Sequence, residues 1–189
     1  MSEILYPIVT APLLRGAAGK PKEEMLPVVD ESGVVTAQMS RSFAHAGTKP
    51  LHPVVHLQVI DRYGRIFLQK RSATRSLLPG YWDTAVGGHV TYGETIHEAL
   101  HREVYEEIGL VEFNPTALGT YVWESDTERE LVHVFAAIGN FDLKPVNDEV
   151  EEGRYWTEKE IFRAVGRDIL TPNFEFEYKR FGPTLQALL

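Results

Sequence analysis

The chain has 189 residues and a hydrophobic fraction of 43%, which suits one globular domain with a buried core, alone or with an arm. Its formal net charge of −8 argues against the broad basic face that duplex nucleic acid requires, whereas small phosphates can still bind through a cation. The absence of cysteine excludes disulfides, a cysteine nucleophile and thiolate metal ligands, and it is compatible with a cytoplasmic location.

The N-terminal segment, residues 1–22, is predicted to be an arm and linker that precedes a single domain at residues 23–189. Its apolar stretch from Ile4 to Leu14 contains two prolines and follows no basic region, so we expect no signal peptide. No apolar run in the sequence reaches the length of a bilayer span, and we therefore expect no membrane partner.

Two β-hairpins are expected at the start of the domain. The segments 25–29 and 34–38 flank a turn-forming Asp-Glu-Ser-Gly sequence, and the segments 54–60 and 65–70 flank Asp-Arg-Tyr-Gly. A short helical turn is expected between the hairpins at residues 40–46. Glycine and proline then predict a loop from Pro79 to Gly88.

The clearest helix is predicted from Ile96 to Ile108. Thr95 can cap its N-terminus, and Glu98 completes a capping box three residues later. Gly109 stands where a glycine commonly ends a helix, because only glycine adopts a left-handed conformation without strain.

The rest of the chain predicts alternating strands and helices. Strands are expected at residues 118–123, 131–137 and 149–156, followed by helices at 157–165 and 174–188. Thr157 with Glu160 forms a second capping box, and Gly182-Pro183 is expected to break or kink the last helix. Together these elements predict the α/β (α+β) class with a mixed central sheet.

Three glutamates of the central helix, Glu103, Glu106 and Glu107, fall within or at the edge of its apolar sector. Carboxylates on a core-facing side are costly unless they are paired or bound to a cation. Hard oxygen ligands favour Mg²⁺ or Mn²⁺, so we expect a metal site there. The alternative from the residues alone is a solvated acidic face with basic partners.

The residues around these glutamates follow the pattern G-x5-E-x7-R-E-U-x-E-E-x-G-U, in which U is aliphatic. Nine specified positions match: Gly88, Glu94, Arg102, Glu103, Val104, Glu106, Glu107, Gly109 and Leu110. The chain therefore resembles the Nudix hydrolases, which implies an α/β/α sandwich. The resemblance also implies that Glu103, Glu106 and Glu107 are catalytic metal ligands, with the Gly87 carbonyl as a further ligand. Arg102 would orient the carboxylates and Glu94 would support the loop.

A second resemblance, to the Nudix-like isopentenyl-diphosphate isomerases, runs almost without gaps from residue 45 to residue 107. It implies a second divalent-metal site, with these ligands: His45, His52, His89, Glu128 and Glu130. It also implies that Arg71 and Arg75 contact a diphosphate. The catalytic cysteine of those isomerases falls at Gly87 here, and their late tryptophan falls at Tyr178, so the resemblance is to an isomerase frame that carries hydrolase machinery.

We therefore expect a Nudix pyrophosphohydrolase that uses Mg²⁺ or Mn²⁺ to split a diphosphate bond in a nucleoside diphosphate linked to another group, or in a related organic diphosphate. Metal ions neutralise the charge of such a substrate and lower the pKa of bound water, and a glutamate can take the proton. Glu149 and Glu152 are further candidates for that base. The alternatives are an isomerase-like enzyme without the cysteine and a non-catalytic ligand sensor. The oligomeric state stays open, a homodimer included.

The other histidines are expected to have ordinary structural or surface roles: His56, His97, His101 and His133. Core packing is the expected role of Trp82, because large aromatic side chains most often fill the interior.

Overall fold

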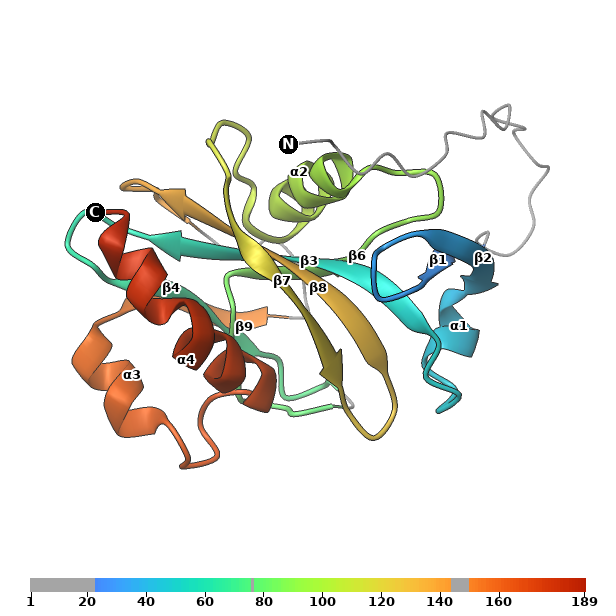
Figure 1. Cartoon of the computed structure of the whole chain (residues 1–189). Coiled ribbons are helices and arrows are strands. Elements are labelled where there is room, and N and C mark those ends of the chain that lie inside the picture. The colour runs from blue at the N-terminus through green and yellow to red at the C-terminus, as the bar shows by residue number, and fades with distance from the viewer. Residues whose placement is uncertain (1–22, 76, 144–149) are drawn as a thin grey trace, which may run out of the picture. The chain divides into compact units, whose positions relative to one another are not determined.

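The computed structural model describes residues 23–75, 77–143 and 150–189 (Figure 1). The predicted arm at residues 1–22 and the candidate base Glu149 lie outside this part of the chain. The chain divides into two compact units, each built from segments that are separate in sequence. Unit 1 comprises Met1–Val55, Gly88–Ala99 and Thr120–His133, and unit 2 comprises His56–Gly87, Leu100–Gly119 and Val134–Leu189.

The first predicted hairpin is present in unit 1. Strands β1 (Met25–Val29) and β2 (Val35–Ser40) pair antiparallel, and α1 (Arg41–Ala44) follows directly. The Ser40 side chain accepts a hydrogen bond from the Phe43 amide and so caps this short helix. Leu26, Met39 and Ala44 form a small core between the three elements.

The main sheet has seven strands in the order β5-β4-β3-β8-β7, with β6 paired to β3 and β9 paired to β4. Its strands are β3 (Leu51–Ile60), β4 (Ile66–Arg71), β5 (Trp82–Asp83), β6 (Val86–His89), β7 (Thr116–Glu124), β8 (Arg129–Ile138) and β9 (Val150–Trp156). The predicted α/β class with a mixed central sheet is confirmed.

The loop predicted from Pro79 to Gly88 is wrong in part, because β5 and β6 lie within it. Gln69 of β4 is paired with Asp83 of β5, so the short strand is stabilised by its neighbour rather than by any pattern of its own.

Helix α2 (Ile96–Ile108) has the predicted bounds. The Thr95 amide donates to Glu98 Oε2 at 2.8 Å, and the Glu98 amide donates to Thr95 Oγ1 at 3.1 Å, which is the expected capping box. Gly109 ends the helix with a φ of 67°, a left-handed conformation that a side chain would strain.

The C-terminal segment forms α3 (Glu158–Ala164) and α4 (Pro172–Ala187). Of the break or kink expected at Gly182-Pro183, the break is wrong, because α4 continues past Pro183. Phe181 and Leu185, on either side of this pair, are both buried, and their packing offsets the hydrogen bond that proline cannot donate. None of the helices in the described residues is long and apolar enough to cross a membrane.

Within unit 2, the two faces of β4 meet different helices. Leu68 belongs to a core cluster that contains Ile161 of α3 and Phe174 of α4, and these helices lie beside β4 and β9 in Figure 1. Gln69, the next residue, instead reaches Glu107 on the C-terminal half of α2. Because successive side chains of a strand point to opposite faces, this part of the sheet lies between α2 on one face and α3 and α4 on the other.

Candidate active site and metal centres

The acidic face of α2 is ordered by Arg102. Its Nη1 atom lies 2.7 Å from Glu103 Oε1 and 3.3 Å from Glu106 Oε2. The Glu103 side chain is largely buried, whereas that of Glu106 is more than half exposed. Charge-assisted hydrogen bonds of this kind restrict the orientation of a carboxylate, and the orienting role that the resemblance implies for Arg102 stays a prediction.

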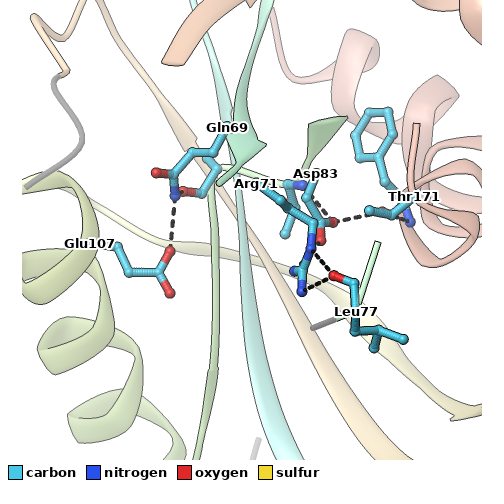
Figure 2. Close-up of polar contacts among 9 residues, drawn as sticks. Gln69, Arg71, Leu77, Asp83, Glu107 and Thr171 are labelled. Atoms are coloured by element: carbon cyan, nitrogen blue, oxygen red, sulfur yellow. Dashed lines mark hydrogen bonds and ion pairs between the residues drawn. The ribbon is translucent and has the colours of Figure 1, made fainter. Parts of the chain in front are cut away.

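Glu107 is held from the sheet side by neutral donors. The Gln69 amide donates to Glu107 Oε2 at 2.9 Å (Figure 2), and the Gly87 backbone also forms a hydrogen bond to this carboxyl. Burial, with the neighbouring charge of Glu103 and a smaller effect of Asp83, raises the pKa of Glu107 to about 8. A bound cation can replace the proton of such a buried carboxyl group and stabilise its charged form. These carboxylates therefore fit a divalent metal.

The loop before α2 is closed by its own glutamate. Glu94 Oε2 accepts a hydrogen bond from the Thr91 amide at 3.0 Å. This contact lies within the loop that the resemblance implies Glu94 supports. The same loop is tied to the hairpin, because the Tyr92 amide donates to the Met25 carbonyl at 2.7 Å.

Four of the predicted ligands of a second metal site lie together in unit 1. One ligand atom from each of His52, His89, Glu128 and Glu130 lies within 4.8 Å of all the others. His52 Nδ1 lies 3.0 Å from the Pro50 carbonyl, so this nitrogen carries the hydrogen and Nε2 presents a lone pair. That Nε2 is buried without a hydrogen-bond partner, and burial lowers the pKa of His52. A neutral imidazole and two carboxylates fit a divalent cation.

His45, the fifth predicted ligand, lies beside this group but outside the set of four. Its Nδ1 lies 3.1 Å from Glu128 Oε1, and its ring centroid lies 5.2 Å from that of His89. Its Nε2 is buried and has no hydrogen-bond partner. In this arrangement His45 orients Glu128, and its free nitrogen leaves it able to join the coordination of a bound ion.

Arg71, predicted to contact a diphosphate, is engaged with its own loop (Figure 2). Its Nε and Nη2 atoms donate to the Leu77 carbonyl, each at 3.1 Å, and Nη1 lies 3.3 Å from Asp83 Oδ2. Asp83 Oδ1 in turn accepts a hydrogen bond from the Thr171 hydroxyl at 2.8 Å. The guanidinium thus braces the loop that carries Arg75, which is partly buried.

Several other expectations can be placed in the structure. Glu152 is exposed on β9, and His97 and His101 are exposed on α2. The expected core role of Trp82 is confirmed, since it is 8% exposed and packs against Trp156 with ring centroids 5.0 Å apart.

Sequence reasoning missed Gln69, Asp83 and Thr171. A signal for Gln69 was present: it follows three apolar residues of its strand, and a buried amide requires a partner.

Comparison with known proteins agrees with this geometry. The family model described as NUDIX domain matches residues 50–174. An uncharacterized Nudix hydrolase, YfcD from Salmonella typhi, is 30% identical, with 73% of this chain and 74% of that protein covered. An isopentenyl-diphosphate Delta-isomerase from Leifsonia xyli is 26% identical, with 77% and 82% covered. Among solved structures, DR0079 from Deinococcus radiodurans has a TM-score of 0.72 at 21% identity, with 83% of this chain and 98% of that chain covered.

Proposed function

The chain belongs to the Nudix family as an enzyme of the pyrophosphohydrolase class, and we propose that it splits a diphosphate bond with Mg²⁺ or Mn²⁺. The substrate we propose is a nucleoside diphosphate linked to a further group, or a related organic diphosphate. The observation that carries this proposal is the Glu107 carboxyl, which is buried beside Glu103 and has its pKa raised to about 8, because a divalent cation would stabilise both acids in their charged form.

Each residue of the α2 site has a proposed role. Glu103, Glu106 and Glu107 would hold the metal, together with the Gly87 carbonyl. A divalent ion bound there would neutralise charge on the diphosphate and lower the pKa of the attacking water. Arg102 keeps Glu103 and Glu106 in position through its contacts of 2.7 and 3.3 Å.

The loop between β4 and β5 is the proposed phosphate contact. Arg75 would meet the diphosphate directly, because an anionic substrate needs cations around it. Arg71 would contribute through the N–H groups that do not contact Leu77 or Asp83. Its contacts with the loop would also set the position of Arg75.

The cluster in unit 1 is proposed as a second divalent-metal site, with His52, His89, Glu128 and Glu130 as ligands and His45 able to join them. The buried, unpartnered Nε2 atoms of His45 and His52 support it. Metal analysis of the purified chain tests this directly: wild type should bind more metal per chain than His52→Ala, and equal metal contents would refute the second site.

The decisive experiment is release of phosphate or of phosphorylated products from a panel of diphosphates that includes ADP-ribose and isopentenyl diphosphate, with Mg²⁺, Mn²⁺ or EDTA. Cleavage that requires metal and is lost in Glu107→Gln is the expected result. Glu112→Gln is the matched control, because Glu112 is exposed just beyond the same helix and carries the same charge. Wild-type turnover in Glu107→Gln would overturn the proposed chemistry.

A second candidate function is isomerisation of isopentenyl diphosphate, favoured by the histidine and glutamate cluster in unit 1 and by the similarity to named isomerases. Gly87 counts against it, because glycine offers no group that could exchange a proton with a carbon atom. Incorporation of solvent deuterium into isopentenyl diphosphate without phosphate release would support isomerisation. Binding of diphosphates without any turnover would instead indicate a ligand sensor.

A further inference from the structure

A buried polar cluster joins the C-terminal helix to the centre of unit 2. His56 and Gln58 lie on one face of β3, and Glu177 reaches them from α4. The exposed fractions are 9% for His56, 3% for Gln58 and 1% for Glu177. His56 Nδ1 lies 2.8 Å from Glu177 Oε2, and the Gln58 amide nitrogen donates to the other carboxylate oxygen.

These contacts define the hydrogen positions on the His56 ring. A carboxylate oxygen can only accept, so the hydrogen lies on Nδ1 and points to Glu177. In the neutral ring, Nε2 is then the acceptor edge. Gln58 holds the second oxygen of Glu177 and prevents the carboxylate from turning away, although its own Oε1 atom is buried without a hydrogen-bond partner.

The cluster lowers the stability of the folded chain. An acid that is 1% exposed costs free energy unless its charge is compensated, and an apolar side chain of similar volume is commonly as stable or more so at such a place. The cost of the orphaned Gln58 oxygen adds to it. Stability therefore does not account for these three residues, and buried polar groups of this kind are often found at functional sites.

The acceptor edge of His56 faces the glycine of the active-site loop. A Cβ atom at Gly87 would lie 3.3 Å from both Cδ2 and Nε2 of the ring, a tight contact, so the ring lies directly against this glycine. Gly87 is also the residue whose backbone is hydrogen-bonded to Glu107. Gly87 thus lies against the His56 ring and also forms a backbone hydrogen bond to the Glu107 carboxyl.

We propose that Glu177 and His56 are positioning residues that hold Gly87 against Glu107 and so set the geometry of the metal-binding carboxylate. This inference rests on the proposed function only in that Glu107 is taken as the metal-binding acid. Glu177 lies beyond residues 50–174, the part of the chain that the family model covers, so the device extends the active site to α4.

Glu177→Gln tests the proposal with a nearly isosteric change. Because Gln58 donates to the other oxygen position, the new amide nitrogen would face His56 Nδ1 and donate to it. The ring hydrogen would then lie on Nε2, which reverses the edge that faces Gly87. The nitrogen chemical shifts of the His56 ring report this reversal, and the Gly87 amide resonance of the metal-free chain reports the loop. We expect both signals to change and kcat to fall by about 10–100-fold with KM little altered, as for other residues that orient metal ligands.

Glu175→Gln is the matched control. It removes the same charge from the same helix, and its side-chain oxygen can still accept from the Gly166 amide. It should leave the His56 ring, the Gly87 amide and kcat unchanged.

His56→Asn keeps the test open if Glu177→Gln does not fold. The asparagine amide can still donate to Glu177, but it lacks the ring edge that reaches Gly87, so the Gly87 resonance should move and kcat should fall. A wild-type Gly87 resonance in His56→Asn, or a wild-type kcat in either folded variant, would overturn the proposal. The resonance needs no substrate, so the result stands even if no diphosphate is hydrolysed.

Discussion

Replacing Glu107 with glutamine should abolish turnover and yet stabilise the metal-free protein at high pH. The pKa of Glu107 rises from an ordinary 4.5 to about 8 in the folded chain, mainly because the group is buried. A group whose folded-state pKa is raised contributes stability fully below pH 4.5, and this contribution is lost as the pH rises through 8. The difference corresponds to about 5 kcal/mol at pH 9. Because Glu107 keeps some exposure to water, we expect about half of that.

Thermal unfolding in EDTA at pH 5 and pH 9 measures this effect. At pH 9, Glu107→Gln should unfold roughly 5–10 °C above wild type, since 1 kcal/mol shifts the midpoint of a chain this long by about 2–4 °C. At pH 5 the two should nearly coincide. Adding Mn²⁺ at pH 9 should raise the wild-type midpoint more than that of the variant. The exposed Glu112→Gln serves as control, and a Glu107→Gln shift of equal size at both pH values would refute the reasoning.

Three further predictions concern stability. Phe174→Ala should destabilise the chain by about 3–5 kcal/mol in urea unfolding, because a fully buried ring is removed from the core of unit 2; a loss below that range would mean the core can close over the gap. Thr157→Ala should cost about 1 kcal/mol by the same measurement, since the capping box with Glu160 loses its hydroxyl; an unchanged midpoint would argue against the cap. Burial lowers the pKa of His133 to about 4, so wild type should lose about 3 kcal/mol as the pH falls from 6.5 to 4. His133→Asn should flatten this decline, and a parallel curve would refute it.

Elements with local signals could be predicted from sequence, and those defined by partners could not. Helix α2 matches its predicted bounds because the Thr95 cap, the apolar periodicity and Gly109 all lie within the segment itself. Strands β5 and β6, of two and four residues, are too short to show any periodicity, and their identity depends on pairing. Helix α4 continues through Pro183 because distant packing overrides a local preference.

The same distinction applies to the site. Glu103, Glu106 and Glu107 could be grouped from spacing alone, since one helix carries all three. The hydrogen bond from Gln69 joins residues 38 positions apart, and that from His56 to Glu177 spans 121 positions. No pattern within one sequence encodes such pairs.

The two glutamines buried in β3 and β4 each donate a hydrogen bond to a carboxylate from a helix. Gln69 holds Glu107, and Gln58 holds Glu177, so each of these two buried acids is fixed by a neutral amide of the sheet. An amide orients a carboxylate without cancelling its charge, whereas an arginine or lysine at the same place would compete with any cation. For Glu107 the charge stays available to a metal, and for Glu177 it stays available to fix the His56 ring.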